Sequence, residues 1–255
     1  MPIYAEQKDR PVILITGFGS FPTVAANASS ILVPRIAETA RRALPGITVA
    51  ASILPTEWEA GLTRLTALVE RLKPTVALHF GVSGRATGFE IETRGRNRCS
   101  LSEDAAGKLP SDTRLSADGP EYLQATLPAA HIVMRLRRRG LPAQISRDAG
   151  GYLCNALLYR SLEIARHSSL PSRTGFIHLP ASLVGERRPS LEPRIAGRLT
   201  WNDVVEGGLE ILSATLGRRL VPIARATPCT GTGRAGTNCG GRSATTPRSS
   251  LSAEG

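Results

Sequence analysis

The chain has few aromatic residues, few cysteines and no long apolar run. Aromatic side chains make up 4% of its 255 residues. No stretch approaches the roughly 20 apolar residues that a membrane-spanning helix requires. The four cysteines, at positions 99, 154, 229 and 239, form neither a Cys-x-x-Cys pair nor a metal-binding knuckle. We therefore expect no membrane span and no zinc finger, and we interpret the cysteines as free thiols.

The first ten residues do not resemble a secretory signal. Met1–Arg10 is polar and leads directly into the short apolar run 12–16. We therefore predict a cytoplasmic protein with no membrane partner. Hydrophobic residues make up 41% of the chain, which is ordinary for a soluble globular protein. The length is sufficient for one sizeable core.

The net charge of +11 raises the question of nucleic acid. The basic residues are mostly arginines spread along the chain, and the one dense run is Arg135, Arg137, Arg138 and Arg139. This run closes a helical pattern, where cations complement the carbonyl end of the helix dipole. No aromatic RNA-binding strand or other nucleic-acid module accompanies the charge. We therefore expect no nucleic-acid partner.

Strand-like and helix-like segments alternate from residue 12 to residue 216. Short apolar runs predict strands at 12–16, 48–54, 75–81, 143–146 and 175–179. Helical spacing predicts helices at 29–43, 57–72, 152–165 and 201–216, together with one that Thr126 caps and Gly140 ends. Residues 98–120 have no period and predict a long loop. This order favours a three-layer α/β/α sandwich around a largely parallel twisted sheet.

Ligands of such sheets gather at the carboxyl ends of the strands. Gly17-Phe18, Gly81, Ser146 and His178 all stand at the ends of predicted strands. We therefore expect these residues to lie along one edge of the sheet.

The composition changes at about residue 227. Residues 227–255 are rich in Gly, Ser and Thr and contain almost no large apolar side chain. Such a segment cannot offset the entropy of ordering. We predict a domain over residues 1–226 and a disordered tail over 227–255. Cys229 and Cys239 lie in the tail without further metal ligands.

Cys154 and His178 suggest a nucleophilic pair. Cys154 follows the glycine pair Gly150-Gly151 at the start of a helical pattern, and His178 ends a later strand-like run. A helix N-terminus and a nearby imidazolium are the features that lower the pKa of a thiol and so favour its reactive thiolate form. Alternatively, the cysteine is a small buried hydrophobe and the histidine belongs to the core.

The residues around Cys154 resemble a signature of the type I pyroglutamyl peptidases. That signature is carried here by Leu141, Ala143, Ile145-Ser146, Asp148-Ala149-Gly150 and Tyr152-Leu153-Cys154-Asn155. The run 175–178, the run Thr16-Gly17-Phe18-x-x-Phe21 and the run Asn27-Ala28-Ser29 are also similar to that family. The resemblance covers residues 12–216 in collinear order.

A second signature of the family fits less well. It ends in Ile-Ser-x-Glu-Arg-Val-Ala-x-Asn, whereas this chain has Glu90-Ile91-Glu92-Thr93-Arg94-Gly95-Arg96-Asn97. Glu92 and Asn97 match, and the residues between them do not. Ser20 also stands where the family has proline.

The resemblance implies a catalytic set of Cys154, His178 and Glu92. It also implies that Phe18, Phe21 and Asn27 contact the substrate. Glu90 competes with Glu92 because it lies on the same strand face, and the two phenylalanines are equally well explained as core residues. His79, His131 and His167 are interpreted as structural.

The function implied by the resemblance is that of a cysteine exopeptidase. It would remove amino-terminal pyroglutamate from peptides through a thioester, without metal or cofactor. The family also implies a homo-oligomer, commonly a tetramer. Two alternatives stay open, namely a divergent cysteine amidase acting on another small cyclic or acyl amide, and a non-catalytic basic protein with the same fold.

Overall fold

The computed structural model describes residues 10–20, 27–168, 172–183 and 199–219. The predicted tail, with Cys229 and Cys239, lies outside these residues, and so does Phe21. Among the described residues, no helix is both long enough and apolar enough to cross a membrane.

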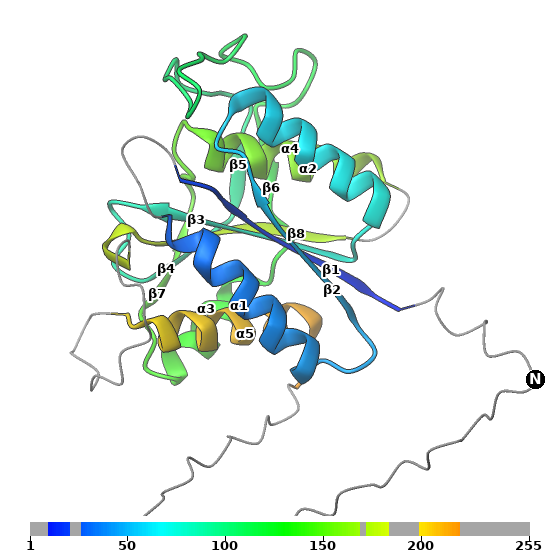
Figure 1. The fold of residues 1–255 in the computed structure, drawn as a ribbon, viewed down its shortest axis with the longest axis vertical. Coiled ribbons are helices and arrows are strands. Elements are labelled where there is room, and N and C mark those ends of the chain that lie inside the picture. The colour runs from blue at the N-terminus through cyan, green and yellow to red at the C-terminus, as the bar shows by residue number, and fades with distance from the viewer. Residues whose placement is uncertain (1–9, 21–26, 169–171, 184–198, 220–255) are drawn as a thin grey trace, which may run out of the picture. The chain divides into compact units, whose positions relative to one another are not determined.

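A six-stranded sheet forms the centre of the fold (Figure 1). Its order is β2-β1-β3-β8-β4-β7. The strands are β1 (Val12–Phe18), β2 (Thr48–Leu54), β3 (Val76–Ser83), β4 (Phe89–Glu92), β7 (Ala143–Ser146) and β8 (Arg173–Pro180). A separate two-stranded sheet consists of β5 (Arg94–Arg96) and β6 (Tyr122–Gln124).

Four of the six strands run parallel and two run the other way. β1 is parallel to β2 and β3, and β3 is parallel to β8. β4 is antiparallel to β8, with Glu90 opposite His178, and β7 is parallel to β4. The carboxyl end of β7 therefore does not lie at the same edge as those of β1, β3 and β8. The expectation for Ser146 was wrong for this reason, because alternation in the sequence does not show the direction of an edge strand.

Helices cover both faces of the sheet (Figure 1). They are α1 (Ala28–Ala43), α2 (Trp58–Leu72), α3 (Ala129–Arg138), α4 (Leu153–His167) and α5 (Trp201–Leu216), with a short 3₁₀ helix over Ala181–Leu183. One apolar core lies between the sheet and α1, α3 and α5, and a second lies between the sheet and α2 and α4. The predicted three-layer α/β/α sandwich is confirmed.

The start of α3 differs from the sequence expectation. Thr126 does not cap α3, whose N-cap is Pro128. The Thr126 hydroxyl instead accepts a hydrogen bond from the Thr174 amide at 2.7 Å, so this side chain belongs to the start of β8. Pro34 lies inside α1, beyond its first turn.

Two residues of the arginine run at the end of α3 pair with α5. Arg135 forms an ion pair with Glu210, and Arg139 pairs with both Glu206 and Glu210 at 2.8 Å. The Arg137 guanidinium donates to the carbonyl of Ala143 at 2.8 Å. Much of this dense positive run is therefore used in holding α3 against its neighbours.

His79 is a core histidine in the middle of β3. Its Nδ1 lies 2.7 Å from the Thr16 hydroxyl and its Nε2 lies 2.9 Å from the Ser161 hydroxyl. Burial lowers the pKa of His79 to about 3, so the ring is neutral. It links β1 and β3 to α4, which fits the structural role expected for it.

Candidate active site

Strand alternation directs His178 and Glu92 to the same face of the sheet. On β8, Ile177 and Leu179 belong to the core under α1, α3 and α5, so His178 points to the opposite face. On β4, the same alternation sends Glu90 and Glu92 to that opposite face. This is the face that α2 and α4 cover, and α4 carries Cys154.

Cys154 is the second residue of α4 and is half-buried. The N-cap residue Tyr152 makes no side-chain cap bond to the helix. The first-turn amides therefore remain available at the positive end of the helix dipole. The thiol packs closely on β3, because a Cβ added at Gly81 would lie 3.1 Å from Cys154 Sγ. Gly81 leaves the space that the sulfur occupies.

His178 lies between Cys154 and Glu92. Its Nδ1 is 2.8 Å from Glu92 Oε1, and the thiol of Cys154 lies close enough to raise the pKa of its ring. Glu92 is 0% exposed, and its Oε2 has no hydrogen-bond partner among the described residues. The buried carboxylate therefore interacts chiefly with the imidazole.

The electrostatics of the site favour a protonated imidazole. Burial alone would lower the pKa of His178, but the charge and hydrogen bond of Cys154 and then those of Glu92 outweigh it. Together they raise the pKa of His178 to about 10. At neutral pH His178 is therefore an imidazolium beside the sulfur of Cys154, and an imidazolium in that position is what activates the cysteine of a Cys–His pair.

Glu90 and Glu92 occupy different positions relative to the imidazole. Glu90 is partly exposed and accepts a hydrogen bond from Gln144 Nε2 at 2.7 Å, whereas Glu92 bonds His178 directly. Ligand atoms of Glu90, Glu92 and His178 lie within 4.8 Å of one another, so the three could hold a metal ion. A metal on His178 Nδ1 would compete with the hydrogen bond to Glu92.

A cavity of about 190 Å³ opens beside Cys154 and His178. Its volume is below that of pockets that take drug-sized ligands, so it suits a small group. Phe18 is 3% exposed, lines this cavity and also belongs to the core under α2 and α4. It is therefore both a core residue and part of the cavity wall. The further lining residues include Thr56, Val82, Ser83, Arg85, Asp148, Ala149, Gly150, Tyr152 and Leu153.

Asn27 also lines the cavity, and its polar atoms are used within the protein. Its Oδ1 accepts hydrogen bonds from the amide and hydroxyl of Ser29, and its Nδ2 donates to the carbonyl of Gly19 at 3.2 Å. Asn27 thus caps α1 and fixes the chain that leaves β1. Its placement fits a residue that shapes the pocket wall.

Two buried asparagines organise the surroundings of the site. Asn155 accepts a hydrogen bond from the Arg96 amide at 2.8 Å and donates to the carbonyls of Arg96 and Arg98 at 2.9 and 2.8 Å. Asn97 bonds the backbone of Leu115, Ser116 and Gly119 and so holds the predicted loop 98–120. Both stand in the signatures, but nothing in the sequence indicated which backbone groups they bind.

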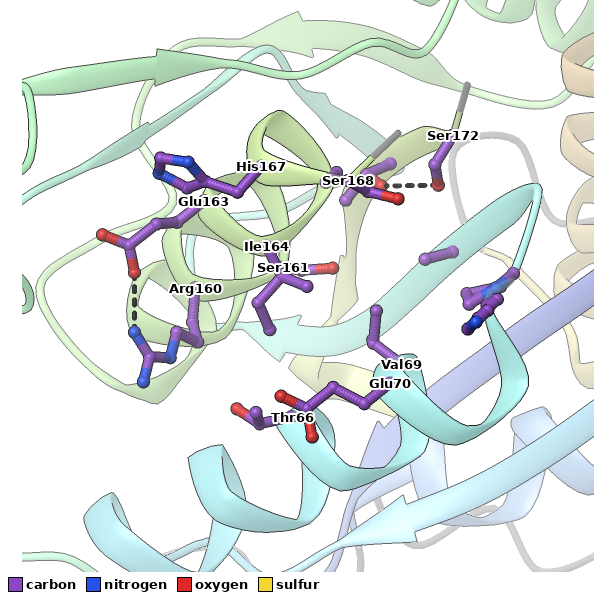
Figure 2. A pocket seen from close by; sticks show the side chains of 15 residues that line it. Thr66, Val69, Glu70, Arg160, Ser161, Glu163, Ile164, His167, Ser168 and Ser172 are labelled. Carbon is purple, nitrogen blue, oxygen red and sulfur yellow. Dashed lines mark hydrogen bonds and ion pairs between the residues drawn. The ribbon is translucent and has the colours of Figure 1, made fainter. Parts of the chain in front are cut away.

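A second cavity, of about 700 Å³, lies between the carboxyl-terminal halves of α2 and α4 (Figure 2). Figure 2 shows Glu70 and Arg160 on its walls, with Arg160 paired to Glu163 at 2.7 Å. It adjoins the starts of β3 and β8, whereas Cys154 and His178 lie toward the other end of α4 and β8. It contains none of the predicted site residues.

An imidazole that adjoins both a half-buried thiol and a buried carboxylate, next to a small cavity, has the chemistry of a cysteine hydrolase. A sequence model described as pyroglutamyl peptidase matches residues 11–187 of the chain. The chain belongs to the pyroglutamyl peptidase family. It is therefore a cysteine peptidase that removes amino-terminal pyroglutamate from peptides. Of the three functions considered from the sequence, this is the one that the comparisons support.

Individual relatives agree with this membership. A pyrrolidone-carboxylate peptidase of Gloeobacter violaceus is 36% identical over 172 residues, which cover 66% of this chain and 80% of the relative. One of Chromobacterium violaceum is 37% identical over 174 residues, covering 66% of this chain and 77% of the relative. A solved structure of a mutant pyrrolidone carboxyl peptidase from the hyperthermophile Pyrococcus furiosus has a TM-score of 0.68 at 27% identity, covering 81% of this chain and 98% of that one.

Proposed function

We propose that Cys154 is the nucleophile, His178 the general base and acid, and Glu92 the carboxylate that orients the imidazole. The observation that carries this assignment is the position of His178, which faces the same cavity as Cys154 and lies 2.8 Å from a carboxylate oxygen of the fully buried Glu92. Glu92 holds the ring in place and stabilises its cationic form, as carboxylates do in related triads.

The reaction proceeds through a thioester. The Cys154 thiolate attacks the pyroglutamyl carbonyl carbon, and the carbonyl oxygen becomes an oxyanion that amides at the start of α4 can stabilise. When the intermediate collapses, the C–N bond breaks and the leaving amine takes the proton of His178. Neutral His178 then accepts a proton from water as the hydroxyl attacks the thioester. Pyroglutamate leaves, and the thiolate–imidazolium pair is restored.

The cavity beside Cys154 would hold the lactam ring. A pyroglutamyl group carries no charge, so it needs apolar walls and a few hydrogen-bond partners rather than a site for an ammonium ion. Phe18 offers a flat wall, and Asn27 keeps the adjoining chain in position. Phe21 remains proposed as a second wall on the strength of the resemblance.

The assignment of the nucleophile is tested with a pyroglutamyl-linked reporter amide. We expect Cys154→Ala to lose turnover by at least about 10⁴-fold while its thermal unfolding stays close to that of the parent. The matched control is Cys99→Ala, because burial, together with the nearby Asp112, raises the pKa of the Cys99 thiol and keeps it inert. A folded Cys154→Ala protein that retained a tenth of the activity would remove Cys154 from the mechanism.

We also propose the cytoplasm as the compartment and a homo-oligomer, such as a tetramer, as the assembly. The reducing conditions of the cytoplasm keep a cysteine nucleophile as a free thiol, which favours that compartment. The assembly rests on the family resemblance. Light scattering on the peak that elutes from a gel-filtration column gives the mass of the assembly. A mass equal to that of the monomer would contradict the proposed homo-oligomer.

A further inference from the structure

The turn between β7 and α4 determines where the first amides of the nucleophile's helix lie. It runs from Arg147 to Tyr152, and Gly150 within it has a φ of +81°, a conformation that favours glycine. An oxyanion site depends on donors that are already in place before the reaction begins. Contacts that fix this turn in place therefore affect the rate of catalysis.

The segment 94–100 contacts this turn at Arg147, Asp148 and Gly151. Arg94 Nε donates to the carbonyl of Arg147 at 2.8 Å. Arg96 Nη2 lies 2.7 Å from Asp148 Oδ1, and the same oxygen accepts the amide of Gly150 at 3.0 Å. The amide of Ser100 donates to the carbonyl of Gly151 at 2.7 Å. The Arg96 guanidinium is thus connected, through a single oxygen of Asp148, to a backbone amide four residues before Cys154.

The segment 94–100 is itself fixed to α4. Asn155, which is 0% exposed, hydrogen-bonds both backbone groups of Arg96. A Cβ at Gly95 would lie 2.9 Å from the backbone of Tyr159, so β5 runs directly against the helix. The two arginines therefore extend from a backbone that is held relative to the nucleophile.

We propose that Arg96, through Asp148, is a positioning residue for the amides at the start of α4, with Arg94 as its auxiliary. The proposal rests on the assignment of Cys154 as nucleophile. Arg94 stands where the family's second signature has valine. The contribution of Arg94 therefore comes from a position at which this chain differs from that signature. Neither arginine is required to touch the substrate, since each acts on the turn.

This role can be separated from a contribution to folding. The side chains of Arg96 and Asp148 are 35% and 46% exposed, and ion pairs of that exposure add little to stability. Loss of the pair should therefore lower the rate of catalysis and leave the melting temperature nearly unchanged.

The test compares Arg96→Gln, Asp148→Asn, the double variant and Arg96→Lys on the full chain. Asp148→Asn keeps an oxygen for the Gly150 amide and removes the charge. We expect each neutral single variant to lose roughly 10- to 100-fold in kcat with KM little changed. The double variant should have about the same kcat as the less active of the two single variants, because both substitutions remove the same link. Arg96→Lys should recover part of the loss.

The matched control is Arg114→Gln. Arg114 forms a similarly exposed pair with Glu121 at 3.6 Å and makes no contact with the turn in the described residues. This variant should keep the parent kcat. An unchanged kcat in Arg96→Gln, or an equal loss in Arg114→Gln, would overturn the proposal.

Two further readouts locate the effect. The aldehyde analogue of pyroglutamate adds to the thiol of Cys154, forming a C–S bond and placing the thiol proton on the former carbonyl oxygen, so its inhibition constant reports the tetrahedral site. The analogue should bind more weakly to the neutral variants, in parallel with their loss of kcat. Alkylation of Cys154 by iodoacetamide expels iodide and forms no oxyanion, so its rate should stay unchanged. Slower alkylation would place the effect on the thiolate and not on the amides, and would overturn the proposal. Activity in Cys154→Ala would instead refute the assignment of Cys154 as nucleophile.

Discussion

The charge on His178 depends on its two neighbours. Burial by itself would lower the pKa of His178, and Cys154 and Glu92 together raise it to about 10. The imidazolium is present below that pKa and is lost as the pH rises through it. The proton that the proposed mechanism transfers to the leaving amine is therefore available at neutral pH and disappears only in strongly alkaline solution.

Glu92→Gln should lower kcat/KM by roughly 10²–10⁴-fold, because the imidazole loses its charged partner. It should also move the alkaline limb of the pH profile downward by roughly one to three pH units. The sign follows from Glu92 raising the pKa of His178, so that its removal lets the imidazolium deprotonate earlier.

Glu90→Gln is the matched control for this experiment. Glu90 lies on the same strand face, but its hydrogen bond goes to Gln144. We expect a near-normal rate and an unmoved alkaline limb. If Glu90→Gln proved the more damaging change, Glu92 would not be the orienting carboxylate.

Gly81→Ala should reduce activity more than it reduces stability. The added methyl carbon would lie 2.7 Å from the Phe176 ring and 3.1 Å from Cys154 Sγ, so the ring and the sulfur must both shift. A displacement of the nucleophile by a few tenths of an ångström is sufficient to disturb attack, and losses of about 10²-fold accompany misplacements near 1 Å. Steady-state kinetics with a thermal melt would check this, and a fully active variant would contradict the close packing.

At the level of elements, α4 connects Cys154, the proposed nucleophile, to the segment that follows Glu92. Asn155 makes the connection with its one acceptor and two donor contacts to the backbone of Arg96 and Arg98. Because these backbone groups are beside a fully buried side chain, losing Asn155 leaves polar groups without partners.

Asn155→Ala should destabilise the protein by roughly 2–4 kcal/mol and slow the alkylation of Cys154. Urea unfolding and iodoacetamide kinetics measure the two effects. The comparison is Asn97→Ala, which also removes a buried asparagine but releases the loop 98–120 instead of α4. We expect that variant to lose stability and to keep its alkylation rate, and equal slowing in both would argue against a specific role for Asn155.

At the level of the whole molecule, the proposed catalytic set draws on β4, β8 and α4, and the described pocket lies within residues 18–178. The segment 227–255 has the composition of a chain that cannot form a core. Deleting it should leave folding and kcat/KM unchanged, and limited proteolysis should cut it first. An insoluble or inactive truncated protein would show that the segment is needed by the rest of the chain.

The sequence by itself determined the layers and indicated the groups that we propose as reactive. Apolar periodicity is a local property, so it predicted the strand over 48–54 and the helix over 201–216 with the bounds that the structure has. The signature around Cys154 and the later His178 were likewise readable, because short motifs carry their chemistry in residue type and spacing.

Only the tertiary structure decided which groups meet. Strand direction at the edge of a sheet depends on long-range pairing, and for that reason the position of Ser146 was predicted wrongly. The preference of His178 for Glu92 over Glu90 follows from where two non-adjacent strands bring their side chains. The link from Arg96 to Asp148 joins residues far apart in the chain, and no local pattern encodes a contact of that kind.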